Sequence, residues 1–163
     1  MKHPNKYNIY IITILKMSIF NLVTSIIKPA SIPKVGFEDI LVAMKEEYYI
    51  IISTFSYDEQ EFLIKGTTLA NTEEKIINDM IQRGKNYEYK IIVYGKNSTD
   101  PTVEVKYTQL LSLGFLHVFV YYGGMFEWVL LREIYGDDLF PCINCMKNVK
   151  EDVLLKWKPN KNI

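Results

Sequence analysis

The feature that most constrains the fold is a set of short apolar runs rich in β-branched and aromatic residues. They are "YYIIIST" at 48–54, "YKIIVY" at 89–94 and "HVFVY" at 117–121. A strand with one face in water alternates apolar and polar residues, whereas these runs are apolar nearly throughout. We therefore predict strands that are buried on both faces, as in a parallel sheet.

The segments between these runs have helical spacing. In 36–47, "GFEDILVAMKEE", one apolar face is predicted to hold Phe37, Ile40, Leu41 and Met44. In 71–83, "NTEEKIINDMIQR", Asn71 or Thr72 is the expected N-cap, and the helical spacing is that of Ile76, Ile77, Met80 and Ile81. Strands that alternate with helices imply parallel β-α-β units with right-handed crossovers, so the predicted fold class is α/β.

The helix after the run 89–94 has clear signals at both ends. Asp100 suits the N-cap, Pro101 suits the first helical position, and Gly114 is the expected stop. A further, largely apolar helix is expected to start at Gly124. Between strand and helix lies the polar loop "GKNSTD", in the type of junction where α/β proteins often place their active sites.

Length and composition predict one folded domain. The chain has 163 residues, of which 48% are hydrophobic and 23% charged, and its formal net charge is zero. The charge balance gives no attraction toward nucleic acid, and we expect no nucleic-acid partner.

The N-terminal segment allows several interpretations. Residues 7–27 are apolar enough for a membrane anchor or a signal peptide, but Lys16 interrupts them and no clean cleavage site follows. Translation from Met17 would leave only a short helix packed on the domain. We expect residues 1–30 to be an apolar tail, either an anchor or dispensable, that ends at the proline-bearing "KPASIP". A cytoplasmic location is expected, with a membrane-anchored protein as the alternative.

The chain has two cysteines, Cys142 and Cys145, and we expect reduced thiols. Such a pair can be redox-active or form half of a zinc site. The chain has only His3 and His117 as histidines, so we expect no zinc site within one chain, and no metal or cofactor. The pair is also expected far from the loop, because the helix from Gly124 carries the chain roughly 17 Å away.

The order of several motifs resembles a rhodanese-like domain over residues 32–141. "IKGT" at 64–67 is similar to the end of a family turn, and "IIVY" stands where the active-site strand ends. "YTQLLSLGFLHVFVY" is similar to the helix and strand that follow. "YYGGMFEW" places Gly123, Gly124 and Trp128 on the family's Gly-Gly-x-x-x-Trp signature. The chain looks closest to rhodanese-like proteins encoded by giant DNA viruses.

The resemblance implies a single domain at 31–141, with a mostly parallel central sheet flanked by helices on both faces and a C-terminal tail at 142–163. In active members, a cysteine at the end of the strand carries a persulfide, which is cradled by loop N–H groups and a helix N-terminus. Here the cysteine position is Gly95, and Ser53 stands near the place of a usual acidic residue. The candidate loop is made up of Gly95, Lys96, Asn97, Ser98, Thr99 and Asp100.

Three interpretations of this loop stay open: a solvated connection capped by Asp100, a pocket for an anion or a peptide, and residual catalysis. The Asp100 carboxylate would already occupy the positive end of the helix dipole, which argues against strong anion binding. "GKNST" lacks the first glycine of a phosphate-binding loop.

We expect a catalytically silent domain that acts as a binding or regulatory module, with an unknown protein or a small anionic ligand as partner. The alternative is a sulfurtransferase that uses Cys142 or Cys145 as a non-standard nucleophile. A membrane-tethered interaction domain is a third class, and it depends on residues 7–27. Trp157 is expected to dock the C-terminal tail onto the domain.

Overall fold

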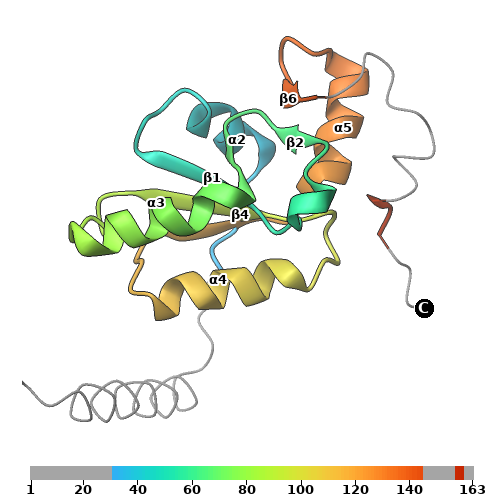
Figure 1. Cartoon of the computed structure of the whole chain (residues 1–163). Helices are drawn as coiled ribbons and strands as arrows, with labels where there is room; N and C mark the ends of the chain where they lie inside the picture. Colours follow the sequence, from blue (N-terminus) through green and yellow to red (C-terminus); the bar gives the residue numbers. More distant parts are fainter. Residues whose placement is uncertain (1–30, 145–156, 160–163) are drawn as a thin grey trace, which may run out of the picture. The chain divides into compact units, whose positions relative to one another are not determined.

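The computed structural model describes residues 31–144 and 157–159, and those from Pro33 onward belong to one compact unit. Four strands form a parallel sheet in the order β3-β1-β4-β5. Figure 1 labels the two inner strands, β1 and β4. Their bounds are β1 Tyr49–Ser53, β3 Thr67–Thr68, β4 Lys90–Tyr94 and β5 Val118–Tyr121. The prediction of an α/β fold with a buried parallel sheet is confirmed.

Helices flank this sheet, as the sequence predicts. Their bounds are α2 Phe37–Ala43, α3 Ala70–Gln82, α4 Thr102–Ser112 and α5 Gly124–Tyr135, with a short 3-10 turn, η1, at Tyr57–Glu59. Residues of α2 and α5 share the main hydrophobic cluster with alternate residues of the strands, including Ile51, Ile92 and Tyr121. The intervening strand residues, such as Ile52 and Val93, are fully buried on the opposite face.

A second, two-stranded sheet lies outside the central one. Strand β2, Leu63–Ile64, pairs antiparallel with β6, Cys142–Ile143. Residues 142 and 143, which the sequence places in the C-terminal tail, thus pair with the domain. Trp157 is only 4% exposed and packs against the domain, which confirms the expected docking of this residue.

The start of α3 differs from the sequence prediction. The N-cap is Leu69 rather than Asn71 or Thr72, and Leu69 has no capping side chain. The amide N–H of Ala70 instead donates to Oε1 of Gln60, 3.0 Å away. A side-chain oxygen from the end of η1 thus satisfies one of the helix's unpaired donors.

The start of α4 also differs in detail. Pro101 takes the N-cap position and Thr102 begins the helix, but the Asp100 side chain still performs the capping: its Oδ1 accepts the Thr102 N–H over 3.0 Å. Gly114 follows the C-terminal end with φ of +92°, as expected for a helix stop.

Within residues 31–144 and 157–159, no helix is long and apolar enough to cross a membrane. Residues 7–27, on which the predicted anchor depends, lie outside the described ranges.

Candidate functional site at the loop between β4 and α4

The loop at 95–100 starts from a rigid support. Strand β4 is central in the sheet, and the Tyr94 ring at its end is fully buried. The Tyr94 hydroxyl accepts the Ile64 N–H over 3.1 Å and donates to Thr67 Oγ1 over 2.9 Å, and Thr67 in turn donates to the Ile64 carbonyl. Burial raises the pKa of Tyr94 well above its usual value. This neutral network ties the end of β4 to the segment joining β2 and β3.

The Asp100 carboxylate occupies the space in front of Gly95. A Cβ added at Gly95 would meet Oδ2 of Asp100 and would lie 2.7 Å from Cγ2 of Val103. Oδ2 also accepts the Lys96 N–H over 2.8 Å, while Oδ1 accepts both the N–H and the hydroxyl of Thr102. An acidic side chain of the loop itself therefore sits where loop and helix donors converge.

The amino-terminal end of α5 supports the loop from another side. The amide of Met125 donates to the Gly95 carbonyl over 3.0 Å, and that of Phe126 donates to the Lys96 carbonyl over 2.9 Å. This contact needs Gly124, which has φ of +63° and whose added Cβ would lie 2.6 Å from the Gly95 oxygen. Gly124, the second glycine of the pair at 123 and 124, thus allows a close approach of helix and loop, whereas a Cβ at Gly123 would meet Glu127 of the same helix.

The polar side chains of the loop are engaged within the protein. Lys96 Nζ lies 2.6 Å from Oε1 of Glu59, and the hydrogen bond from Lys96 lowers the pKa of that carboxyl. Asn97 Oδ1 accepts from both the N–H and the hydroxyl of Thr99, while its Nδ2 donates to the Trp157 carbonyl over 2.7 Å. The cation and the amide of the loop therefore already have partners.

The structure brings together some of the predicted site residues and not others. Gly95, Lys96, Asn97 and Asp100 converge on the junction with α4, while Ser98 and Thr99 are exposed at the tip of the loop. Glu59 and Trp157 are contacts that spacing along the chain could not reveal, because each is far from the loop in sequence. Ser53 is buried, and its hydroxyl accepts from Gln60 Nε2 over 3.4 Å.

Cys142 differs from the expectation of reduced thiols, because it is disulfide-bonded. It lies in β6 beside Ile64, outside the loop. Cys145 is outside the described residues. Within those residues, no group of three or more histidine, cysteine or acidic side chains could hold a metal ion.

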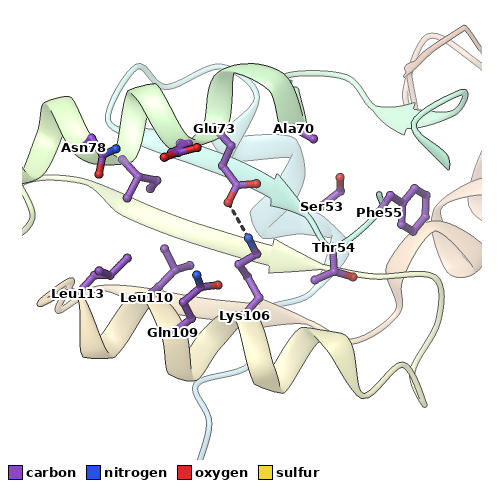
Figure 2. A pocket seen from close by; sticks show the side chains of 12 residues that line it. Ser53, Thr54, Phe55, Ala70, Glu73, Asn78, Lys106, Gln109, Leu110 and Leu113 are labelled. Carbon is purple, nitrogen blue, oxygen red and sulfur yellow. Dashed lines mark hydrogen bonds and ion pairs between the residues drawn. The ribbon is translucent and has the colours of Figure 1, made fainter. Parts of the chain in front are cut away.

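A separate cavity of about 470 Å³ lies between α3 and α4, near the end of β1 (Figure 2). Glu73 from α3 and Lys106 from α4 point toward each other across it and form an ion pair of 2.7 Å. Both side chains are more than three-quarters buried, and the pair joins the two helices. Ile77 and Leu110 form part of the apolar lining.

Comparison with known proteins relates this architecture to solved structures. No family model and no curated protein matches the chain. A yeast protein, Ygr203w, described as a protein tyrosine phosphatase of the Rhodanese family, is similar with a TM-score of 0.51 and 15% identity, over 72% of this chain and 95% of that one. The fold is rhodanese-like.

Two further structures from Anabaena sp. come from one protein, Alr3790. One is similar with a TM-score of 0.50 and 18% identity, covering 69% of this chain and 93% of that one. The other is its Rhodanese_3-like domain, with a TM-score of 0.41 and 21% identity over 58% of this chain and 98% of that one. At identities of 15% and 18%, the yeast structure and the first Anabaena structure bear on the fold alone.

Proposed function

We propose that this rhodanese-like domain is catalytically silent and serves as a binding or regulatory module. The observation that carries the proposal is the occupied space at Gly95. The resemblance puts the sulfur-carrying cysteine at this position, yet a side chain there would meet Asp100 and Val103.

The electrostatics of the loop support the same conclusion. A persulfide or a bound oxyanion needs converging N–H donors and a nearby positive charge. Here the Asp100 carboxylate accepts the N–H groups of Lys96 and Thr102, and the Lys96 ammonium is paired with Glu59. An incoming anion would have to displace one carboxylate and draw Lys96 away from another. Of the two partner classes expected from the sequence, we therefore favour a protein over a small anion.

The rival proposal is a sulfurtransferase that uses Cys142 or Cys145. A thiolate is the reactive form of cysteine, so disulfide-bonded Cys142 would have to be reduced before it could attack a sulfur donor. A phosphatase activity, as the description of the yeast protein suggests, would likewise need a nucleophile at the loop.

Turnover assays test this proposal directly. The full-length protein, oxidised or pre-reduced with a phosphine reductant that is then removed, is incubated with thiosulfate and cyanide, and in parallel with p-nitrophenyl phosphate. We expect no thiocyanate or nitrophenolate above the level of heat-treated protein. Steady product formation that is lost in the Cys142→Ser or the Cys145→Ser variant would contradict the silent binding module and support an enzyme.

A designed variant provides a stricter control. Gly95→Cys combined with Asp100→Ala supplies the thiol and removes the carboxylate from the space in front of it. With thiosulfate as the donor, the introduced thiolate attacks the outer sulfur and sulfite leaves, so we expect this double variant to gain a persulfide adduct, visible as a mass increase of one sulfur atom, while Gly95→Cys alone gains less. If both variants load equally, Asp100 is not the obstacle.

We also propose that the protein is cytoplasmic and that it is related to the rhodanese-like proteins of giant DNA viruses. Cell fractionation of the chain started at Met1 and at Met17 tests the first. Membrane association of the Met1 form alone would contradict a cytoplasmic protein.

A further inference from the structure

An aromatic socket lies beside the loop. It is formed by Phe55, Phe62 and Asn97, and Trp157 fills it. The Trp157 ring stacks on Phe55 with centroids 6.2 Å apart and planes inclined by 25°. It meets Phe62 edge to face at 5.9 Å and 81°. Both phenylalanines are themselves buried, and Phe55 also packs on the Tyr94 ring at the end of β4.

The socket contacts the backbone of Trp157 as well as its ring. Asn97 Nδ2 donates to the Trp157 carbonyl over 2.7 Å. The orientation of the Asn97 amide is fixed, because its Oδ1 accepts both the N–H and the hydroxyl of Thr99. An aromatic pocket combined with a fixed donor for a backbone carbonyl recognises one residue of a peptide by both of its parts.

The elements that form the socket are loops at the carboxyl ends of β1 and β4. Phe55 follows β1, Phe62 precedes β2, and Asn97 belongs to the loop after β4. Loops on a rigid sheet are where α/β domains usually bind ligands. Trp157, the residue that fills the socket, lies 60 positions after Asn97 in the chain.

We propose that this socket is a docking site for a tryptophan-bearing peptide segment, and that Trp157 is its intramolecular occupant. A partner that presents a tryptophan side chain together with the carbonyl of the same residue would compete with Trp157 for Phe55, Phe62 and Asn97. This deepens the proposed binding function by specifying the partner's chemistry. The cavity between α3 and α4 shares one lining residue with this socket, Phe55.

The intramolecular occupant has a concentration advantage. A segment of the same chain faces its site at a high effective concentration, because the two are covalently linked. A free peptide of the same sequence should therefore bind the intact protein weakly, and a protein without the Trp157 side chain more strongly. Access of a partner would depend on release of Trp157.

The test uses the full-length Trp157→Ala protein and a fluorescein-labelled peptide with the sequence of residues 151–163, EDVLLKWKPNKNI. Fluorescence anisotropy measures binding, with the same peptide carrying alanine in place of tryptophan as control. We expect the variant to bind the tryptophan peptide at least tenfold more tightly than the wild-type protein does, and neither protein to bind the alanine peptide.

A second pair of variants shows where the peptide binds. Adding Asn97→Ala to Trp157→Ala removes the carbonyl donor and should weaken binding several-fold. Adding Val105→Ala, at an exposed position on α4, should leave it unchanged. Equal binding of both peptides, or no binding by a folded Trp157→Ala protein, would overturn the proposal.

Loss of the folded state in Trp157→Ala, seen as loss of helical circular dichroism, would also overturn it, because Trp157 would then be a permanent part of the core. The thiosulfate assay reports separately on catalytic silence. Failure of the proposed docking site can therefore be distinguished from failure of the proposal that the domain is catalytically silent.

Discussion

The carbonyl oxygen of Gly95 accepts a hydrogen bond from the amide of Met125, 3.0 Å away. This bond joins the end of the central strand to the first turn of α5, and Gly124 lies directly against it. Two helices thus hold the loop: α4, which follows it directly, and α5, which comes later in the chain.

Gly124→Ala should destabilise the protein strongly. The residue has φ of +63°, and an added Cβ would lie 2.6 Å from the Gly95 oxygen. We expect the free energy of unfolding to fall by about 2 to 4 kcal/mol, because backbone strain and a clash with main-chain atoms add together. Urea denaturation followed by circular dichroism measures this.

Gly84→Ala is the matched control, because Gly84 has φ of +64° but nothing within 4 Å of the added Cβ. The free energy of unfolding of this variant should fall by only about 1 kcal/mol, which is the cost of the left-handed conformation itself. Equal losses at the two positions would show that contact with the loop contributes nothing.

Gly95→Ala should be rescued in part by Asp100→Ala. The alanine methyl group would meet the Asp100 carboxylate, so the single variant is expected to lose about 1 to 3 kcal/mol of stability. Asp100→Ala alone removes the cap of α4 and should lose about 1 kcal/mol. In the double variant, the loss should be smaller than the sum of the two by at least about 0.5 kcal/mol. Additive losses in denaturant titrations would mean that Val103 alone crowds position 95.

Gln60→Ala should shorten or weaken α3. Gln60 Oε1 accepts the first helical amide, that of Ala70, and loss of such a cap costs about 1 kcal/mol. Hydrogen exchange should quicken at the amide of Ala70, with little change at Val103 in the first turn of α4. Unchanged exchange at Ala70 would show that water replaces the glutamine without loss.

Tyr94→Phe should destabilise the protein by about 1 to 2 kcal/mol, because it leaves the buried Ile64 N–H without its acceptor. Tyr122→Phe is the control, because the Tyr122 hydroxyl donates to Glu104 in an exposed hydrogen bond, and this variant should lose less stability. Thermal unfolding at pH 7 compares the two variants. Equal losses of stability in the two variants would mean that the buried network of Tyr94 stabilises the protein no more than an exposed hydrogen bond does.

Alkaline pH should unfold the wild-type protein through Tyr94 and Tyr121. Burial raises the pKa of both phenols above that of an exposed tyrosine, so the folded state holds their protons more tightly than the unfolded state does. This contribution to stability is complete below the unfolded pKa of about 10 and declines as pH rises above it. Absorbance at 295 nm should show these two phenols ionising only together with loss of circular dichroism. Ionisation of every tyrosine before unfolding would contradict this expectation.

The apolar runs predicted β1, β4 and β5, and the helical spacing predicted the four helices and the position of the loop, whereas the pairing of β2 with β6 was not foreseen. The apolar runs of β1, β4 and β5 had no amphipathic alternative, and local signals such as Asp100 and Gly114 act within a few residues of where they stand. The motif order also indicated the rhodanese-like fold, and the Gly-Gly pair marked the approach of α5. These features can be predicted from the sequence because they depend on residues close to one another in the chain.

The contacts that fill the site form only in the folded protein. Gln60 replaces the N-cap expected from the sequence, and Glu59 engages Lys96. Trp157 docks as expected, but its place against Phe55, Phe62 and Asn97 could not be read from the sequence. Each of these contacts joins residues far apart in the chain, and periodicity and spacing carry no information about such pairs. The carboxylate of Asp100 was recognised as a helix cap, but its place against Gly95 depends on how tightly the loop closes.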